Sequence, residues 1–410
     1  MFRLPFLFII TGMISFLLFH GASIFALFDW LQQDLRGPSG WFYTHVFVLG
    51  WATMLAMGAV YQLINVILQS TIYSKRLGYA HYACFTVGLS GLLYGFVTMK
   101  TMYIAAFATF AFIGILLFAV NIGVTLWRAN KWDAITISAA CAVLYLVLTG
   151  LMGMWMGVNF YTGNRAQLHE HLLRAHIWLG TIGWFGMLIT GFSYKMLPMF
   201  YLAHHYPTKL QWATLITWNS AVMFGAISFL LGGGFWLTWL ALLLVMIALI
   251  FYTIHLLRIK KYRIKLNPGY GILWSVYAAQ FLLLFVGGML LFTLVFPAQL
   301  LHPQFVLLAG WVYLGGWVSF TILCYMSKII PFLWWTHKYG KLAGRPGTPL
   351  MADLLDDKKV RMGVIVIALC LFVLFTAIVI DSKSFIAMAA LILSISSVLY
   401  MILIGRVFRQ

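Results

Sequence analysis

Twelve apolar segments of helical length follow one another along the chain, and only short polar stretches separate most of them. Each segment has about 20 residues or more, the length that a helix needs to cross the hydrocarbon core of a bilayer. The pattern predicts an all-α polytopic membrane protein with a single transmembrane domain over residues 1–410. The expected spans run near residues 6–28, 41–69, 78–98, 101–127, 134–157, 169–200, 208–231, 236–257, 269–296, 302–333, 362–380 and 385–405.

The composition agrees with this pattern, because 63% of the residues are hydrophobic and only 8% are charged. A soluble domain has about 25% charged residues. The formal net charge of +18 would otherwise indicate nucleic acid as a partner. Here Lys and Arg gather in particular loops between the spans, which is typical of a topology signal. We therefore expect the lipid bilayer, and no nucleic acid, as a partner.

The basic residues also predict how the chain crosses the membrane. Loops after even-numbered spans carry most of them, including the run RIKKYRIK at 258–265, whereas loops after odd-numbered spans carry few. The positive-inside rule then places both termini in the cytoplasm. The first apolar run, Phe6–Phe28, is too long for the core of a signal peptide and lacks a small-x-small cleavage site. We expect it to be a retained first span.

Spans two, six and ten are related to one another at a fixed offset. Their Gly-Trp pairs stand at 50–51, 183–184 and 316–317, so that each pair follows the one before it by the same offset of 133 in the numbering. Several matches at one offset indicate a threefold repeat. We therefore expect three pseudo-threefold four-helix arcs, at about residues 1–130, 131–265 and 266–410. Further pairs at this offset are Gly58 with Gly191, Tyr61 with Tyr194, His169 with His302, Lys195 with Lys328, and Pro198 with Pro331.

Histidines stand near the expected outer ends of the same three spans. Span two carries His45, span ten begins with His302, and span six carries His169, His171 and His176 within the stretch HEHLLRAH. Ionisable groups at membrane depth are costly and usually face a bundle interior, which favours a functional site. The alternative is that each ring is satisfied by a backbone carbonyl or by interfacial water. Five histidines in equivalent spans make a functional site the favoured interpretation.

Helix spacing decides how the span-six histidines can act. His169 and His176 are seven residues apart, so they lie on one helix face at a separation of roughly 10 Å and cannot share one metal ion. His171 points to a different side. Leu173 stands where an H-E-x-x-H zinc motif needs its second histidine. One helix therefore offers separate single ligands, which suits a heme iron that takes one axial nitrogen from each of two helices.

Other residues near these histidines have two interpretations each. Arg36 and Arg174 are placed to pair with heme propionates, although an interfacial arginine also extends to water without any partner. Met152, Met154 and Met156 resemble a Cu(I)-binding pattern, but alternating helix positions point in different directions, so packing is favoured. No acidic residue lies at mid-membrane depth. We therefore do not expect a proton pump.

The spans and their histidines together resemble subunit I of the heme-copper oxidase superfamily. Twelve spans in three arcs, with histidines at the outer ends of spans two, six and ten, carry a resemblance that covers the whole topology. The segments THVFVLGWATMLAMGAVYQLI and AHIWLGTIGWFGMLITGFSYKMLPMF are similar to short oxidase-subunit-I-like proteins and to nitric-oxide-response heme proteins. The resemblance implies b-type heme and a location in the bacterial cytoplasmic membrane.

The resemblance also implies ligands. In the family, one histidine of span two and one of span ten hold a low-spin heme, which correspond here to His45 and His302. A second span-ten histidine holds a high-spin heme, but Gln304 stands at that position. The family's copper site uses an adjacent histidine pair in span seven, which has no histidine here, and His204-His205 lies in a loop on the cytoplasmic side. The chain looks like the scaffold with its dioxygen-reducing centre removed or rebuilt around the span-six histidines.

We therefore expect a membrane protein with one or two b-type hemes that serves either electron transfer or the binding of a diatomic gas, nitric oxide or dioxygen. The expected electron donor is a quinol or a cytochrome. We expect His45 and His302 on one iron, and His176 with His169 or His171 at a second site. Two alternatives stay open: a copper or heme transport or assembly factor, and a divergent nitric oxide reductase or quinol oxidase. Whether the protein is an enzyme, and whether copper accompanies heme, also stays open.

Overall fold

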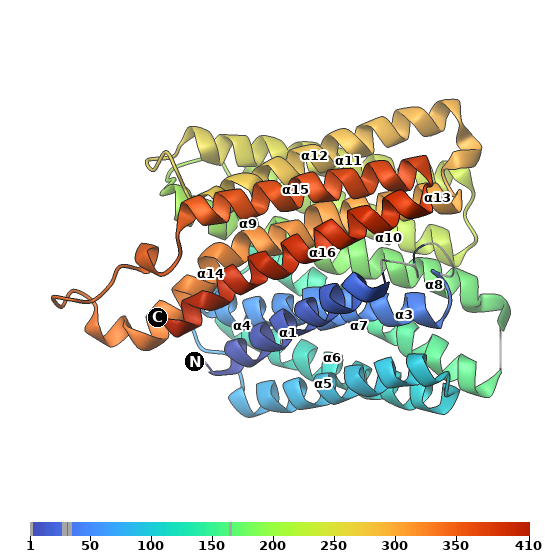
Figure 1. Ribbon diagram of the computed structural model, residues 1–410, viewed down its shortest axis with the longest axis horizontal. Coiled ribbons are helices and arrows are strands. Elements are labelled where there is room, and N and C mark those ends of the chain that lie inside the picture. The colour runs from blue at the N-terminus through green and yellow to red at the C-terminus, as the bar shows by residue number, and fades with distance from the viewer. Residues whose placement is uncertain (1–2, 27–30, 32–34, 164–165) are drawn as a thin grey trace.

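The computed structural model describes residues 3–26, 31, 35–163 and 166–410, and these residues form helices and connecting turns without a β-strand. Among them, twelve helical spans are long and apolar enough to cross a membrane. The expected all-α, multi-pass fold is therefore confirmed. The spans run roughly side by side along the long axis of the molecule, and α1 begins at the same end at which α16 finishes (Figure 1).

Nine of the described spans are continuous helices. They are α1 (Arg3–Ala26), α5 (Lys75–Thr98), α6 (Thr101–Ala129), α7 (Ala134–Thr162), α10 (Lys209–Leu230), α11 (Phe235–Lys261), α12 (Tyr270–Val295), α15 (Asp357–Ile380) and α16 (Lys383–Gly405), which runs on into the short η8 (Arg406–Arg409).

The other three spans are composite, because each contains a π-helical stretch between two α-helices. Span two consists of α3 (Pro38–His45), η1 (Val46–Thr53) and α4 (Met54–Leu68). Span six consists of α8 (His169–Trp178), η3 (Leu179–Phe185) and α9 (Gly186–Tyr201). Span ten consists of α13 (Pro303–Trp311), η5 (Val312–Ser319) and α14 (Phe320–Lys338).

The three π-helices recur at the spacing of the sequence repeat. They begin at Val46, Leu179 and Val312, so their starts are separated by the same offset as the Gly-Trp pairs. Each contains one of these pairs, and the side chains of Trp51, Trp184 and Trp317 are all fully buried. π-Helical turns are rare and are frequent at functional sites. The outer helices that precede the three π-helices, α3, α8 and α13, are therefore candidates for carrying a functional site.

The composite spans form the centre of the bundle. Between 56% and 78% of their apolar windows is buried, against 33–44% in the other nine described spans. The indole Nε1 of Trp51 donates a hydrogen bond to Ser319 Oγ at 2.9 Å, and Tyr313 OH donates to the carbonyl oxygen of Thr181 at 3.0 Å. These bonds join span ten to both span two and span six, so the three composite spans are held against one another.

The nine continuous spans surround this centre. Each contacts the next in the order α1, α5, α6, α7, α10, α11, α12, α15 and α16, and α16 contacts α1. The ring is thus closed, and it separates the composite spans from the lipid over much of their length. The grouping of these helices into three pseudo-threefold arcs stays a prediction.

Some helix ends differ from the expected ones because charged residues lie inside a helix. The helix α5 begins at Lys75 instead of 78, and the Ser74 hydroxyl accepts a hydrogen bond from the backbone of Leu77. The helix α15 begins at Asp357 instead of 362, and the Asp356 side chain caps it. Caps allow polar first turns that a hydropathy pattern leaves out. The expected end of the first span, near 28, lies outside the described residues.

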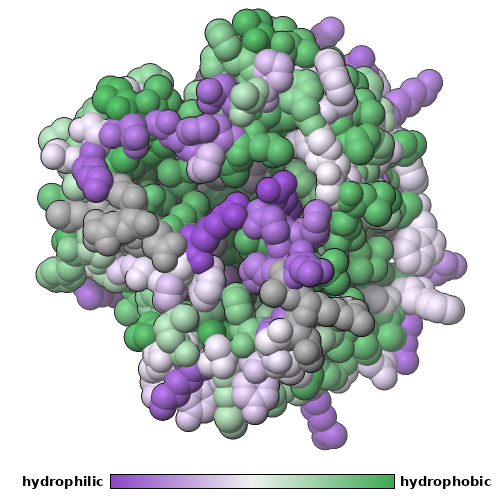
Figure 2. All heavy atoms as spheres, turned by 90° about the vertical axis from the view of Figure 1, so that its right-hand side faces the viewer, coloured by the Kyte–Doolittle hydropathy of each residue, from purple (hydrophilic) through white to green (hydrophobic). Residues whose placement is uncertain are grey.

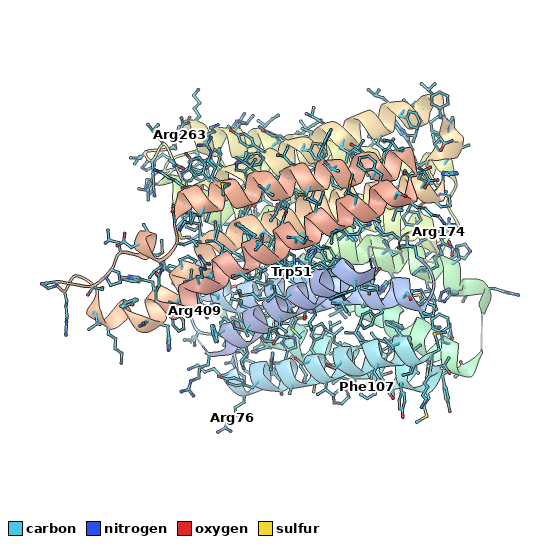
Figure 3. The ribbon with its side chains drawn as sticks, viewed as in Figure 1. Trp51, Arg76, Phe107, Arg174, Arg263 and Arg409 are labelled. Atoms are coloured by element: carbon cyan, nitrogen blue, oxygen red, sulfur yellow. The ribbon has the colours of Figure 1, made fainter. Side chains whose placement is uncertain are left out.

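Basic side chains mark one end of the molecule. Arg76, Arg263 and Arg409 lie at that end, Trp51 lies near the middle, and Arg174 lies at the opposite end (Figure 3). The histidines expected near the outer ends lie on α3, on α8 and immediately before α13, and these helices lie at the same end as Arg174 (Figure 1 and Figure 3). The distribution follows the pattern from which we expect both termini in the cytoplasm, and that orientation stays a prediction.

Candidate functional site

His45 is the last residue of α3, immediately before the π-helix η1. Its Nδ1 lies 2.7 Å from the carbonyl oxygen of Trp41, one turn earlier in the same helix. A carbonyl oxygen only accepts hydrogen bonds, so Nδ1 carries the proton and Nε2 keeps its lone pair in the neutral ring. The ring also lies 5.0 Å from the ring of Phe96 on α5. His45 is therefore oriented by its surroundings with Nε2 as the ligating nitrogen.

His176 is oriented in the same way from span six. Its Nδ1 lies 2.9 Å from the carbonyl oxygen of Thr149 on α7, so this nitrogen is the donor and Nε2 again keeps its lone pair. The ring rests against the backbone of α7 at Gly153, where an added Cβ would lie 3.0 Å from the ring Cε1. Gly153 therefore allows the imidazole to approach α7 closely enough to reach the carbonyl oxygen.

The structure brings His45 and His176 together. Their rings are near enough for an electrostatic interaction between them, and they come from two different central spans. Histidines that hold a metal usually donate their second ring nitrogen to a carbonyl or carboxylate oxygen, which fixes tautomer and ring orientation. Both rings meet this condition. The two side chains thus form a half-buried pair of pre-oriented imidazoles at the outer end of the bundle.

The other two histidines of span six point in the directions expected from helix spacing. His169 packs on Phe160 of α7, with ring centroids 5.0 Å apart, so it faces the same helix as His176. His171 faces α10, where its Nδ1 donates to the carbonyl oxygen of Phe229 at 3.1 Å. The three rings of HEHLLRAH therefore do not converge on a common point. His171 is the second span-six histidine with a fixed Nδ1, but it lies on a different side of α8 from the pair.

His302 lies apart from the pair. It is the N-cap residue of α13, its backbone is extended, and its side chain is exposed. The structure describes no contact between His302 and His45. The described contacts thus give no support to the expected His45–His302 pair, which stays a prediction, whereas His176 lies within electrostatic range of His45. The physical reason is that His302 precedes the first helical turn of span ten, so its side chain is outside the bundle.

Two arginines and one glutamate cover the outer ends of spans two and six. Glu170 accepts from Arg36 Nη1 at 3.0 Å and from Arg174 Nε at 2.9 Å. These three described residues together carry one net positive charge. Arg174 therefore lies where we expected it, near the outer end, with Glu170 as its present partner. Hydrophilic side chains gather at the centre of this end of the molecule (Figure 2).

A separate apolar cluster lies beside the histidine pair. Leu92, Phe96, Ile104 and Ala108, from α5 and α6, form a buried group distinct from the main core of the protein. Trp41 packs on this group, with its ring 5.8 Å from Phe96 and 5.2 Å from Phe160. The pair thus has apolar and aromatic side chains on the α5–α7 side and charged ones at the rim.

The repeat shows what occupies the equivalent positions elsewhere. One and two repeat offsets after His45, the chain has Trp178 and Trp311. Trp178 packs on Phe229 with ring centroids 5.6 Å apart, as His45 packs on Phe96, and Phe96 and Phe229 are themselves related by the repeat. The Nε1 of Trp178 donates to the carbonyl oxygen of Val222 at 3.1 Å. The second interface therefore holds a buried indole where the first holds an imidazole.

The position of His176 is likewise not repeated. Its equivalents are Tyr43, one repeat offset earlier, and Ala309, one repeat offset later. Neither side chain offers a second imidazole at its interface. Only the interface between spans two and six therefore has a histidine at both positions.

No cluster for a bare metal ion is present among the residues that the structure describes. Groups of three or more His, Cys, Asp or Glu side chains with suitable spacing are not found there. His204 and His205 have ring centroids 6.4 Å apart and lie between α9 and α10, at the end opposite to the pair.

Three further buried histidines were not identified as candidates from the sequence. Each has a side-chain partner: His20 with Ser394 at 3.2 Å, His81 with the hydroxyl of Tyr61 at 3.0 Å, and His255 with Gln211 at 3.1 Å. The repeat offered a signal for two of them, because Tyr61 and Tyr194 are equivalent, Tyr61 contacts His81 and Tyr194 packs on His255.

No protein-family model matches the chain, and no curated protein sequence matches it.

Proposed function

We propose that this integral membrane protein binds one b-type heme between His45 and His176 and transfers electrons. The observation that carries the proposal is the pair of pre-oriented imidazoles. Each Nδ1 donates to a backbone carbonyl oxygen, each Nε2 keeps its lone pair, and the two rings lie within electrostatic range of each other on two different central spans. An iron with two axial histidines needs this arrangement.

The surrounding residues fit such a group. Arg36 and Arg174 share a single carboxylate at the rim, which leaves positive charge for the propionates of a heme. The apolar cluster around Phe96 suits the face and edge of a macrocycle and excludes water from it. When bound, heme supplies a one-electron couple, and the chain's own residues hold it, orient it and set its surroundings.

Two axial histidines favour electron transfer over gas binding. A heme with both axial positions taken has no open position for nitric oxide or dioxygen. Gas binding would require one of the two rings to leave, and each is fixed by a hydrogen bond to a helix backbone. No observation in the described part of the chain favours the copper-transport alternative. None favours a second metal beside the heme either, and an oxidase or a reductase would need one, so these alternatives are not proposed.

The resemblance to oxidase subunit I supports the same class of protein but a different position for the heme. A closed ring of helices around three central spans agrees with that resemblance. In the proposed site, however, span six supplies the partner of the span-two histidine, and His302 of span ten is not a ligand. We place the protein in the bacterial cytoplasmic membrane with both termini in the cytoplasm, and with a quinol or a cytochrome as its redox partner.

An optical spectrum of the purified full-length protein tests the proposal. Expressed with sufficient heme, the protein should show a Soret band and, after dithionite reduction, the sharp α-band of a six-coordinate b-type heme. Carbon monoxide should not shift the reduced spectrum, because both axial positions are taken. Absence of any Soret band would refute heme binding, and a carbon monoxide shift of the whole heme population would refute the two-histidine site.

A further inference from the structure

A groove lies on the lipid-facing side of α6, near the end of the molecule at which the basic side chains gather. It has a volume of about 430 Å³ and is lined by Ala119, Val120, Gly123, Val124, Trp127 and Arg128. At a rise of about 1.5 Å per residue, these positions span roughly 14 Å along the helix. Val120 and Trp127 are 52% and 78% exposed, so a molecule in the bilayer can enter the groove from the side.

Arg128 stands at the membrane-surface end of the groove, in the last turn of α6. Its guanidinium carbon lies 4.4 Å from the ring centroid of Tyr73, and a guanidinium that stacks on a ring keeps its N–H edge available to an anion. Among the described residues, no hydrogen bond and no ion pair of the Arg128 side chain is found, whereas Lys131 has Asp133 at 3.8 Å. The positive charge of Arg128 is therefore free to bind a ligand.

The loop before α5 brings more positive charge to the same place. The backbone nitrogen of Ser74 donates to Oδ1 of Asn121 on α6 at 3.0 Å, which holds the start of α5 against the last turns of α6. Lys75 and Arg76 follow directly and are exposed, and the first turn of α5 contains no acidic residue. Each basic residue at a membrane surface adds to the attraction for anionic headgroups. The end of the groove at Arg128 therefore attracts negative charge.

The same charges oppose a second copy of the chain as the occupant. Two copies packed through α6 in one membrane would place Lys75, Arg76 and Arg128 of both chains at the same depth, and like charges across an interface are costly. An uncharged lipid would place an acyl chain in the groove without using the guanidinium. A molecule with an acyl chain and an anionic headgroup matches both parts of the groove.

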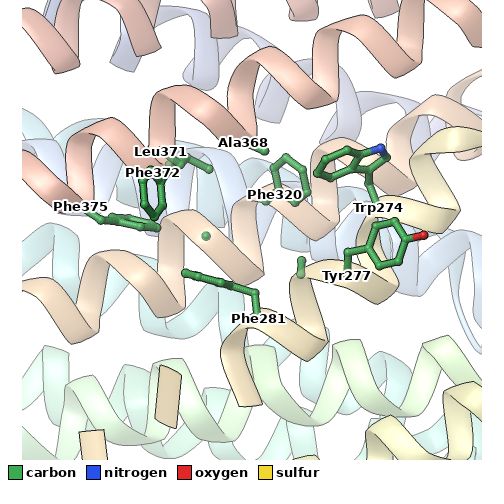
Figure 4. Close-up of a pocket in the computed structure, with 10 residues that line it drawn as sticks. Trp274, Tyr277, Phe281, Phe320, Ala368, Leu371, Phe372 and Phe375 are labelled. Carbon is green, nitrogen blue, oxygen red and sulfur yellow. The ribbon is translucent and has the colours of Figure 1, made fainter. Parts of the chain in front are cut away.

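A second lipid-facing groove shows the difference that Arg128 makes. It has a volume of about 200 Å³ and lies between α12, span ten and α15, where Phe281, Phe372 and Phe375 are part of its lining (Figure 4). The described residues that line it include no charged side chain. Such a lining accepts any acyl chain and selects no headgroup, whereas the α6 groove ends at a guanidinium.

We propose that the α6 groove binds one anionic phospholipid. The phosphate accepts hydrogen bonds from the Arg128 guanidinium, and one acyl chain lies along residues 119–127. The exposed indole of Trp127 lies at the level of the headgroups, where amphipathic aromatic rings are enriched. Arg76 marks this end of the molecule, opposite to Arg174 and the histidine pair (Figure 3), so the lipid site does not depend on heme.

The test is native mass spectrometry of the delipidated full-length protein, titrated in detergent with phosphatidylglycerol or with phosphatidylcholine. The first phosphatidylglycerol should bind about tenfold more tightly than the first phosphatidylcholine, because several basic residues act together. Arg128→Gln should reduce this preference about fivefold, since the phosphate loses one cation. Arg345→Gln is the matched control, because it removes the same charge from an exposed loop position at the same end. The control should keep the preference of the parent protein.

A second pair of variants tests the apolar part of the groove. Val120→Trp places a large ring where the acyl chain lies and should weaken phosphatidylglycerol binding severalfold. Val87→Trp on α5 is its control, because that valine lies outside the groove and is 51% exposed, against 52% for Val120. It should bind phosphatidylglycerol as the parent protein does. Circular dichroism of every variant checks the fold without reference to lipid or heme.

Equal binding of the two phospholipids to the parent protein, or equal losses in Arg128→Gln and Arg345→Gln, would overturn the proposal. So would unchanged phosphatidylglycerol binding in both groove variants. A dimer that dissociates in Val120→Trp and ignores phosphatidylglycerol would make a second copy the occupant and would also overturn it. Because heme is scored by its own spectrum, failure of the lipid site is distinguishable from failure of the heme site.

Discussion

At the scale of single residues, the important property of the candidate site is that backbone hydrogen bonds fix the tautomer of each histidine ring. His45 and His176 were both expected as ligands because they are histidines at the outer ends of central spans. Their pairing was not predicted, because it depends on the rotation of two helices about their axes, which packing decides and a sequence pattern does not. Gly153 and the carbonyl oxygen of Thr149 orient His176, and neither has a signature in the sequence.

Gly153 should strengthen heme binding although it contacts no metal. Gly153→Val places a branched side chain where a single Cβ already lies 3.0 Å from Cε1 of His176. The ring is then displaced from the Thr149 carbonyl oxygen, and we expect roughly tenfold weaker heme binding, the effect typical of lost outer-shell support. The measurement is heme content per chain after purification.

The control is Gly123→Val in the neighbouring helix α6, where an added Cβ would have no heavy atom within 4 Å. It should retain its heme. Equal losses in the two variants would show that the effect is a general consequence of a valine in a membrane helix.

Arg174 should tune the reduction potential of the heme. Arg174→Gln removes a positive charge near an iron that gains an electron on reduction, so the midpoint potential should become more negative. The side chain is 40% exposed and already pairs with Glu170, so we expect a shift below about 60 mV. Potentiometric titration measures it. Lys100→Gln, which removes another cation of the same end, should have a smaller effect, and a positive shift for Arg174→Gln would contradict this account.

At the scale of elements, hydropathy and length predicted all twelve spans because each had to satisfy its backbone inside a hydrocarbon layer. Helix ends were less predictable, as at Lys75 and Asp357, because capped first turns contain charges. The π-helices were not predicted at all. Each backbone hydrogen bond of a π-helix joins residues five apart in place of four. Over a single turn this difference leaves the spacing of hydrophobic residues almost unchanged. The Gly-Trp repeat nevertheless marked their positions.

An ion pair should hold the start of α15 against the inner end of the bundle. Asp357 accepts from Lys328 Nζ at 3.2 Å and lies 3.3 Å from the backbone nitrogen of Tyr270, and both side chains are about one-third exposed or less. A double-mutant cycle with Lys328→Met and Asp357→Asn should give a coupling of about 1 kcal/mol in unfolding stability, measured in detergent. A coupling indistinguishable from zero would show that the pair contributes nothing.

At the scale of the whole molecule, the sequence repeat predicted a special role for spans two, six and ten, and these spans occupy the centre of the closed ring. The repeat does not distribute function equally. The positions equivalent to His45 are Trp178 and Trp311, and this asymmetry was visible in the sequence only once the structure showed which residues face each interface.

The asymmetry leads to a stoichiometry of one heme per chain. Iron analysis combined with the pyridine hemochromogen assay should give a ratio near one, because the two other interfaces lack a histidine pair. A ratio near two would show that a second site exists, for example at His171, and would contradict the single-site account without affecting heme binding at the first interface.

The orientation in the membrane can be tested independently. In a chain without its native cysteines, a cysteine at Lys341 should react only with reagents added on the cytoplasmic side, and one at Lys100 only with reagents added outside. This follows from the positive-inside rule. The reverse labelling pattern would place the histidine pair near the cytoplasmic surface and would change which redox partners can reach it.

The most direct measurement of the central claim is the heme content and reduced spectrum of three histidine variants, with imidazole added back. His45→Gly and His176→Gly should each lose the six-coordinate spectrum, and added imidazole should restore it to both, because each variant lacks one axial nitrogen. His302→Gly, at the exposed end of span ten, should keep the parent spectrum. Loss of the spectrum in His302→Gly together with its retention in His176→Gly would contradict the proposed pair and would favour the ligands that the oxidase resemblance implies.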